Sequence, residues 1–300
     1  MAVNWFIRQR IDQIQNFMKH PIETQNGVLF SQLFHAEKTE YGKKFGFKDI
    51  SSYRDFQQQV PIVNYEEFEP YIEKARQGQK DISWPGVIRQ FAKSSGTTNA
   101  KSKFIPISDE SLEDCHYKAG KDLISIYANN HPDNQLFLNK NLRLGGSAEL
   151  YESFNTKFGD LSAILIENLP FWVEITTVPS KKTSLMSEWE TKLKAIVSEV
   201  KNQDVGSLTG VPSWMMVLLQ RILTETGKGN ISEIFPNLEA FFHGGISFKP
   251  YREQYKKIIG KDINYYEIYN ASEGFFGIQD RSGSDEMLLM LDYGIFYEFI

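Results

Sequence analysis

Residues 92–106 read AKSSGTTNAKSKFIP. Four hydroxyl side chains surround one glycine in this stretch, and two lysines follow: Ser94, Ser95, Gly96, Thr97, Thr98, Lys101 and Lys103. The glycine lets the backbone turn and approach a ligand closely. Consecutive amides in such a turn form an anion-binding concavity, to which the lysines add positive charge. The stretch therefore predicts a binding loop for a polyphosphate.

The spacing of these residues is neither the P-loop pattern G-x-x-x-x-G-K-[ST] nor a dinucleotide fingerprint. A solvated Ser/Thr turn between two strands explains the composition alone equally well, because hydroxyl-rich loops are common. From composition, both readings stay open.

Strands and helices alternate in the second half of the chain. Strands are expected at 204–210, 238–245 and 263–274, with helices between them at 212–227 and 249–260. This order predicts an α/β fold with largely parallel pairing.

Helical spacing dominates the first half. Ile7, Ile11, Ile14 and Met18 form one predicted helical face. Residues 51–80 predict two short helices divided by the extended VPIV. Two longer helices are expected after Ser108 and within 184–202. Their predicted buried faces are Leu112, Cys115, Ala119, Leu123 and Ile126 in the first, and Trp189, Leu193, Ile196, Val197 and Val200 in the second.

Bulk properties exclude several classes of function. The net charge of −5 comes without a basic block, so nucleic acid is not an expected partner. A single cysteine, Cys115, rules out an intrachain disulfide and fits a reducing compartment. No stretch reaches the roughly twenty apolar residues of a membrane span, and no His/Cys cluster has zinc-site spacing. We expect a cytoplasmic protein without a membrane partner.

The order SSGTT followed by a lysine resembles the phosphate loop of the adenylate-forming enzymes, the superfamily of acyl-CoA ligases, luciferases and peptide-synthetase adenylation domains. YNASE at 269–273 resembles their Tyr–small–small–Thr/Ser–Glu loop. FHGGIS at 242–247 stands where the superfamily has a glycine pair near adenine. Three matches in the right order favour the nucleotide reading over a plain turn.

The finer resemblance is to the GH3 family of acyl acid–amido synthetases, in particular its bacterial-type members. It rests on YGKKFGF, VPIVNYEEFEPYIE, FAKSSGTTNAKSKFIPIS, LTGVPSWM, GGISFKPY, YNASEGFFGIQD and LLMLDYGIFYEFI. It implies a ligase that uses ATP and Mg²⁺ to adenylate a carboxylic acid and then joins the acyl group to an amino acid, releasing AMP. Coenzyme A as acceptor, and a non-catalytic nucleotide- or acyl-binding fragment, remain alternatives.

The resemblance also assigns roles to single residues. Ser94, Ser95, Gly96, Thr97 and Thr98 match the phosphate loop, and Lys103 matches its closing lysine. Tyr269 is expected against adenine, Ser272 near the α-phosphate and Glu273 on Mg²⁺, while Gly244 and Gly245 let the backbone approach the base. Lys103 and Glu273 are the expected catalytic pair.

An acyl pocket is expected around the LTGVPSWM segment, through Val211, Trp214 and Met215. Phe275 and His243 are further candidates for this pocket. An apolar helix start is equally often plain core. A lone histidine after a buried strand is more often a structural residue than a general base.

Family members continue past the YGIFYEFI segment with a ribose-binding acid, a hinge and a closing domain that carries a lysine. None of these occurs in 1–300, so the resemblance implies an incomplete N-terminal adenylation domain. The expected division is a mainly helical lead-in at 1–85 and an α/β nucleotide- and acyl-binding region at 86–300. The expected C-terminal domain would pack over the site.

Overall fold

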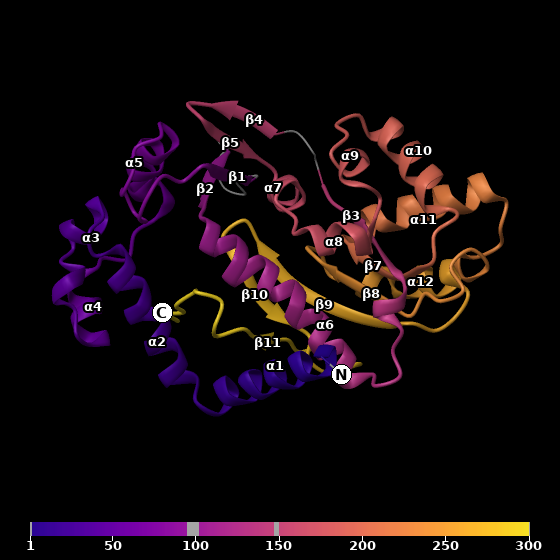
Figure 1. The fold of residues 1–300 in the computed structure, drawn as a ribbon, viewed down its shortest axis with the longest axis horizontal. Helices are drawn as coiled ribbons and strands as arrows, with labels where there is room; N and C mark the ends of the chain where they lie inside the picture. The colour runs from indigo at the N-terminus through magenta and orange to yellow at the C-terminus, as the bar shows by residue number, and fades with distance from the viewer. Residues whose placement is uncertain (1, 95–101, 147–149, 300) are drawn as a thin grey trace.

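Two mixed β-sheets flanked by helices form the fold in the computed structural model, which describes residues 2–94, 102–146 and 150–299 (Figure 1). The smaller sheet has the strand order β2-β1-β5-β4 and the larger has the order β11-β10-β9-β8-β7-β3-β6. The α/β expectation with largely parallel pairing is confirmed.

The smaller sheet consists of four short strands: β1 (Gln90–Ser94), β2 (Lys103–Ile107), β4 (Leu150–Ser153) and β5 (Thr156–Gly159). The larger sheet contains β3 (Lys140–Leu144), β6 (Thr177–Val178), β7 (Val205–Gly210), β8 (Ala240–Gly244), β9 (Asn264–Ala271), β10 (Gly274–Ile278) and β11 (Leu288–Leu289). Strands β6, β3, β7, β8 and β9 run parallel, while β10 and β11 pair antiparallel.

Helices cover both faces of the larger sheet. On one face α10 (Trp189–Val200), α11 (Pro212–Thr226) and α12 (Arg252–Ile259) pack against β3, β7 and β8. On the other face α1 (Ala2–Lys19) and α6 (Lys118–Asn130), preceded by a π-helical turn at Ser111–Tyr117, cover β8, β9 and β10. All of the predicted buried positions in the Ser108 helix are buried, and in the 184–202 helix only Trp189 is partly exposed.

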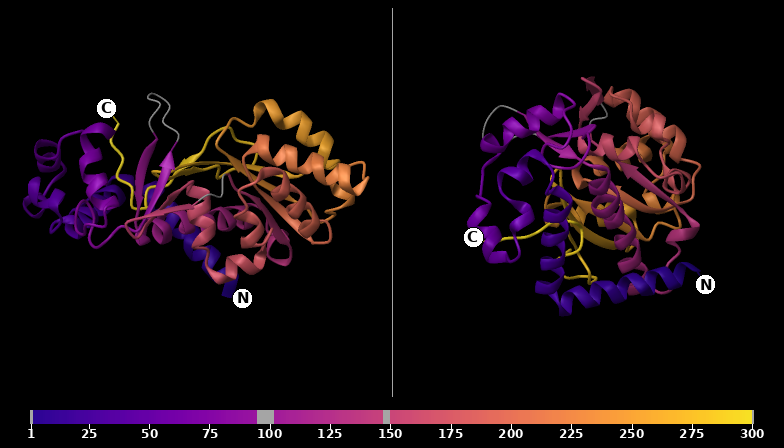
Figure 2. Two further views of the ribbon diagram at one scale, coloured as in Figure 1. Left: turned by 90° about the horizontal axis from the view of Figure 1, so that it is seen from above. Right: turned by 60° about the vertical axis from the view of Figure 1, so that its left-hand side comes forward.

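The remaining helices lead in from the N-terminus or connect strands. They are α2 (Pro21–Ala36), α3 (Glu40–Lys44), α4 (Tyr53–Gln59), α5 (Tyr65–Arg76), α7 (Leu161–Glu167), α8 (Phe171–Thr176), α9 (Lys181–Ser184) and 3₁₀ turns at Phe47–Asp49, Leu136–Leu138, Ile231–Glu233 and Lys249–Tyr251. Helices α3 to α5 lie at one end of the molecule and α10 to α12 at the other (Figure 2). None of the helices among the described residues combines the length and apolar character needed to cross a bilayer.

Local chemistry explains the main helix ends. Asn64 and Glu67 form a capping box at the start of α5, so VPIV stays extended before it, as expected. Pro212 begins α11, where its missing N–H leaves no hydrogen bond unmade. Gly260 ends α12 with a φ of +80°.

One position of the predicted helical face at the N-terminus was wrong. Met18 is 45% exposed, and Phe17 is buried instead. Phe17 lies three residues after Ile14, which places both side chains on the face of α1 that packs against α6. The apolar end of the chain forms strand only at Leu288–Leu289. Beyond it, Met290 and Tyr293 are buried against α1 without joining a sheet.

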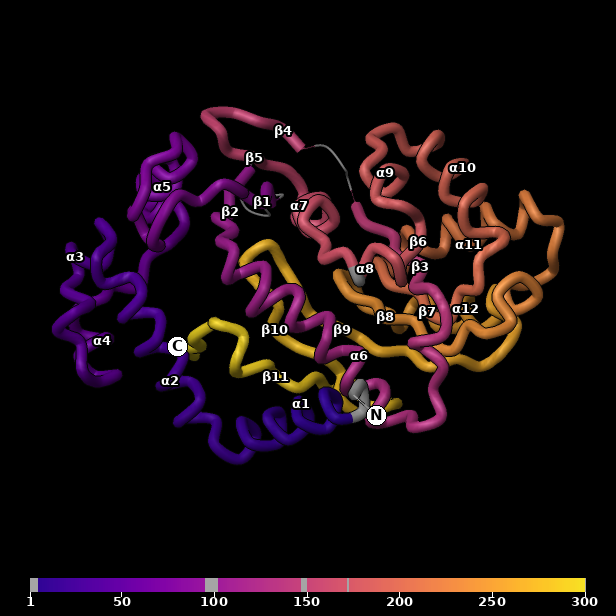
Figure 3. Tube along the Cα trace, viewed as in Figure 1, coloured from indigo at the N-terminus to yellow at the C-terminus, as the bar shows by residue number. Residues whose placement is uncertain are grey.

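A buried charge cluster fastens this C-terminal segment. Arg10 of α1 donates to Asp122 of α6 at 2.7 Å and to Asp292 at 2.6 Å. The hydroxyl of Tyr293 donates to Asp122 at 2.6 Å, and Lys118 pairs with Asp292 at 3.0 Å. Farther along, Figure 3 shows the segment passing α2, where it is held by the Gln25 amide. The cluster therefore ties α1, α6 and residues 290–295 together.

Arg10→Met should leave Asp122 and Asp292 without their main cation. Breaking a buried ion pair on one side costs about 3–5 kcal/mol, so we expect a loss of that order in the free energy of unfolding. Urea denaturation followed by circular dichroism measures it. The control Arg221→Met removes a solvent-screened pair with Glu225 and should have a clearly smaller effect. Equal effects of the two substitutions would contradict the assignment.

Two buried histidines should make the fold sensitive to mild acid. Burial lowers the pKa of His116 to about 4. Burial and the charge of Arg252 lower that of His243 to about 3. The unfolded chain binds these protons near pH 6.5, so the folded state loses stability as pH falls below that value.

We expect each of these histidines to contribute up to about 1.4 kcal/mol of lost stability per pH unit between about pH 6 and 4. Unfolding free energies across this range, with NMR titration of the imidazoles, check it. The substitution His20→Gln, at an exposed position, should not alter the curve. A His243 signal that titrates near pH 6.5 would refute the prediction.

Candidate functional site

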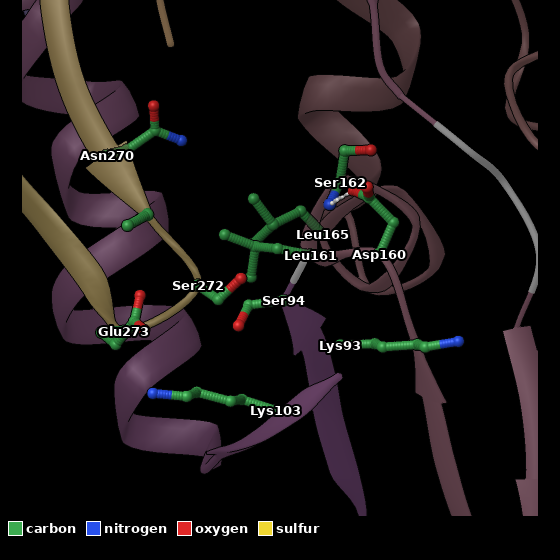
Figure 4. Close-up of a pocket in the computed structure, with 11 residues that line it drawn as sticks. Lys93, Ser94, Lys103, Asp160, Leu161, Ser162, Leu165, Asn270, Ser272 and Glu273 are labelled. Atoms are coloured by element: carbon green, nitrogen blue, oxygen red, sulfur yellow. Dashed lines mark hydrogen bonds between the residues drawn. The ribbon is translucent and has the colours of Figure 1, made fainter. Parts of the chain in front are cut away.

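A cavity of about 510 Å³ opens where the smaller sheet meets the carboxyl end of β9. Four elements contribute side chains to it: β1, β2, the start of α7 and the β9–β10 turn (Figure 4). The lining residues are Lys93, Ser94, Lys103, Asp160, Leu161, Ser162, Leu165, Asn270, Ala271, Ser272 and Glu273. Parallel sheets characteristically bind ligands outside the carboxyl ends of their strands.

The β1–β2 hairpin supplies Ser94 and Lys103. Its antiparallel register places these two residues directly opposite each other. The residues between them that were predicted to hold phosphates, Ser95, Gly96, Thr97 and Thr98, lie outside the described residues, as does Lys101. The described ends of the hairpin, Ser94 and Lys103, both line the cavity.

Tyr65 of α5 contacts both the Lys103 side chain and the adjacent backbone of β2. The Lys103 ammonium lies 5.0 Å from the centre of the Tyr65 ring. The Tyr65 hydroxyl accepts the backbone N–H of Phe104 at 2.8 Å. One tyrosine thus holds both the backbone and the charged end of this lysine, which the sequence reading did not foresee.

The β9–β10 turn brings Ser272 and Glu273 to the cavity. Gly274 follows at a position where an added Cβ would lie 2.5 Å from Cδ1 of Ile295, so the turn is pressed against the C-terminal segment. The N–H of Phe275 donates to Sγ of Cys115 at 3.2 Å, which fastens the base of the turn to the π-helical turn before α6. The Glu273 carboxylate makes no hydrogen bond or ion pair with the described residues.

The opposite wall is the first turn of α7. Asp160 caps this helix by accepting the N–H of Ser162 at 2.8 Å. Ser162 in turn accepts the N–H of Gly146 at 3.0 Å, and Lys192 donates to the Gly146 carbonyl at 3.1 Å. Burial lowers the pKa of Lys192, while the charge of Asp160 opposes this. The sequence analysis missed this wall, although Asp160 ahead of an apolar run is a recognisable N-cap signal.

Residues expected beside the nucleobase lie along the same edge of the sheet. Gly244 pairs with Ile268, and an added Cβ there would lie 2.4 Å from the Ile268 carbonyl oxygen. Gly245 has a φ of +82°. Tyr269 is 57% exposed, with its ring 5.1 Å from that of Phe276. These residues do not line the cavity, and their contact with a base stays a prediction.

The five residues expected in an acyl pocket are not gathered around one cavity. Met215 of α11 is fully buried in the core, and Phe275 is buried beside Cys115 of the π-helical turn before α6. Trp214 is 50% exposed and packs edge-on against Trp189. Val211 precedes α11, and His243 lines a different, smaller cavity. Their acyl-binding role stays a prediction.

The cavity thus combines two lysines, serine hydroxyls and the Glu273 carboxylate, which has no partner among the described residues, on separate elements. Lysine and hydroxyl donors suit phosphate oxygens. One carboxylate with phosphate oxygens and waters is the usual protein environment of Mg²⁺. The residues present therefore fit a magnesium-bound polyphosphate. No group of three or more acidic, His or Cys side chains among the described residues could hold a metal by itself.

Comparisons with known proteins agree with this architecture. The model of the GH3 family N-terminal domain matches residues 10–263. The solved GH3.15 acyl acid amido synthetase superposes with a TM-score of 0.72 at 14% identity, covering 93% of this chain and 58% of that one. A 2-hydroxyisobutyryl-CoA ligase superposes with a TM-score of 0.57 at 15% identity, over 90% of this chain and 54% of that one.

Curated relatives match over shorter stretches. Indole-3-acetic acid-amido synthetase GH3.3 of Arabidopsis thaliana is 33% identical over 92 residues, which are 30% of this chain and 15% of that protein. Jasmonoyl–L-amino acid synthetase JAR6 of Nicotiana attenuata is 32% identical over 104 residues, 34% of this chain and 18% of that protein.

The chain spans only part of these relatives, between 15% and 58% of the four proteins named. The solved structures, at this level of identity, support the fold, which is that of the large N-terminal part of the adenylate-forming enzymes. The family model, in contrast, covers most of the chain from Arg10 onward. The protein therefore belongs to the GH3 family.

Proposed function

We propose that this chain carries the adenylating part of an ATP-dependent acyl acid–amido synthetase that requires Mg²⁺ and works in the cytoplasm. The observation that carries the proposal is the shared cavity of Ser94, Lys103, Ser272 and Glu273. These residues come from two motifs about 170 residues apart in sequence, and each motif resembles a nucleotide-binding segment of the adenylate-forming enzymes.

In the first step, a carboxylate oxygen of the acid attacks the α-phosphorus of ATP and pyrophosphate leaves. No protein nucleophile is needed, so the contribution of the protein is alignment and stabilisation of charge. We assign Ser94 and Lys103, together with Ser95, Gly96, Thr97 and Thr98, to the phosphates. Ser272 faces the α-phosphate, and Glu273 would hold Mg²⁺, which supplies additional positive charge beside the phosphate oxygens.

In the second step, an amino acid's neutral amine attacks the acyl carbon. The C–N bond forms, AMP leaves with the bonding electrons, and the amine proton passes to solvent or a nearby base. We propose that a C-terminal domain packs over the cavity for this step. The first acids to test are those that appear in the names of the relatives, indole-3-acetic acid and jasmonic acid. A third is 2,4-DB, which is bound in a solved structure of GH3.15.

The defining experiment is acid-dependent exchange of labelled pyrophosphate into ATP. A synthetase catalyses this exchange, whereas a non-catalytic nucleotide-binding module does not. Trapping the adenylate with hydroxylamine, then offering amino acids or coenzyme A, distinguishes an amido synthetase from an acyl-CoA ligase. Absence of exchange with every acid in a broad panel would reject the proposal for this chain.

Lys103→Ala and Glu273→Ala should each reduce the pyrophosphate exchange rate by about 100-fold or more, because each removes a charge that stabilises the transition state. Initial exchange rates at saturating ATP measure the effect, and thermal melts confirm folding. The controls Lys182→Ala and Glu253→Ala remove the same charges from exposed helices and should keep the parent rate. A full rate in either test variant would reject the assignment.

Tyr65 should act as a positioning residue for Lys103. Tyr65→Leu removes the ring beneath the ammonium and should raise the KM for ATP by about 2- to 30-fold, as expected for a cation–π contact. Tyr65→Phe keeps the ring and should recover most of that loss. Steady-state exchange with varied ATP separates KM from the maximal rate. Equal KM values for the two variants would show that the ring does not position Lys103.

A further inference from the structure

A second cavity, of about 210 Å³, lies apart from the candidate active site. Its walls come from β8, β9, the beginning of α12 and the turn that follows β10. A water molecule occupies about 30 Å³ of liquid, so this volume corresponds to about seven waters. The space suits a small metabolite rather than a nucleotide or a peptide.

Two unpaired charges of opposite sign line this cavity. Arg252, the first residue of α12, and Glu267, in the middle of β9, make no side-chain hydrogen bond or ion pair with the described residues. Burial and Asp285 raise the pKa of Glu267, whereas the positive charges of Lys249 and Arg252 lower it. The two charges thus line one small cavity without forming an ion pair with each other.

The other charged pair at this cavity is already satisfied. Lys249 and Asp285 form an ion pair at 3.0 Å, and both side chains are well exposed. This pair lies at the rim and leaves Arg252 and Glu267 as the groups available to a ligand. A ligand that satisfied both would need a cationic and an anionic group close together.

The walls between these charges are held in place. Gln279 accepts the N–H of Glu267 at 2.8 Å through its side-chain oxygen, and its amide donates to the Ser284 carbonyl at 2.7 Å. These bonds fix the turn after β10 to β9. On the opposite side, the His243 ring stacks on Phe248 at 4.2 Å. The cavity is therefore a preformed feature and not a gap between loose loops.

His243 adds an unsatisfied polar group to the cavity lining. The residue is 2% exposed, and its Nδ1 atom has no hydrogen-bond partner among the described residues. Leaving a buried polar atom unpaired costs about 1–3 kcal/mol, so such groups in native proteins call for an explanation. A molecule bound in the cavity, together with its ordered water, would give the Nδ1 atom a hydrogen-bond partner.

We propose that this cavity binds the zwitterionic backbone of a free α-amino acid, with its carboxylate on Arg252 and its ammonium on Glu267. The carboxylate and ammonium of an α-amino acid are joined by one carbon, which suits two opposite charges on the walls of one small cavity. The side chain would lie toward Phe248 and His243. Small amino acids fit the volume best.

This site is separate from the candidate active site. Glu267 precedes Asn270, the first β9 residue at the larger cavity, by three positions, which is about 10 Å along a strand. An odd number of positions also directs the two side chains to opposite faces of the sheet. The inference therefore does not depend on the proposed ligase activity, and it describes a second, non-reacting site.

Calorimetric titration of the 300-residue chain with glycine, L-alanine, L-valine and L-aspartate tests the proposal. At least one of these probes should bind at millimolar or lower concentration. Its N-acetyl and amide derivatives, which each lack one charge, should bind at least about 10-fold more weakly. Shifted NMR signals of the His243 ring on addition of the amino acid should locate the binding. Absence of binding by all four would overturn the proposal.

Arg252→Gln and Glu267→Gln should each weaken this binding by at least about 10-fold, since each removes one of the two charges. Lys256→Gln and Glu253→Gln change the same charges on the exposed side of α12 and should leave it unchanged. Thermal melts verify folding of each variant. Undiminished binding by both test variants, or displacement of the amino acid by AMP, would overturn the proposal. Displacement by AMP would assign the cavity to the nucleotide instead.

Discussion

Parallel hydrogen bonding among β7, β8 and β9 is the constraint on which the site depends. The register pairs Gly210 with His243 and Gly244 with Ile268, so the three strands end at one edge. Strand β8 is buried on both faces. Its pairing register with the neighbouring strands is therefore fixed, because a shift by one residue would exchange the core positions of Phe241 and Phe242. The β9–β10 turn with Glu273 is placed by this register.

A second constraint comes from outside the larger sheet. The β1–β2 hairpin belongs to the smaller sheet, and α5 contacts it through Tyr65. The cavity therefore forms at a junction of two sheets, in which Ser94 and Lys103 approach from the smaller sheet and Glu273 approaches from the larger one. Such a junction suits a reaction in which a charged substrate must be held in line while no covalent bond to the protein forms.

The end of the chain shows how a strongly apolar segment can be buried without becoming a strand. Residues 290–295 pack on α1 and α6, and Arg10, Asp122 and Asp292 supply the polar contacts. Ion pairs this well buried have large desolvation penalties, so they stabilise mainly by fixing which partners meet. The cluster therefore specifies the path of the segment beneath the site.

The sequence by itself determined the element types, because periodicity and capping act locally. Asn64, Pro212 and Gly260 mark their helix ends as plainly in the sequence as in the structure. The motif resemblance also predicted that Ser94, Lys103, Ser272 and Glu273 lie close together, and all four line the larger cavity. Tertiary structure alone decided that Phe17 and not Met18 is buried, that Tyr65 supports Lys103, and that α7 forms the opposite wall. It also separated Met215 and His243 from the larger cavity. These outcomes depend on contacts between residues distant in sequence, and no local pattern encodes which of several apolar or aromatic side chains a neighbouring element will meet.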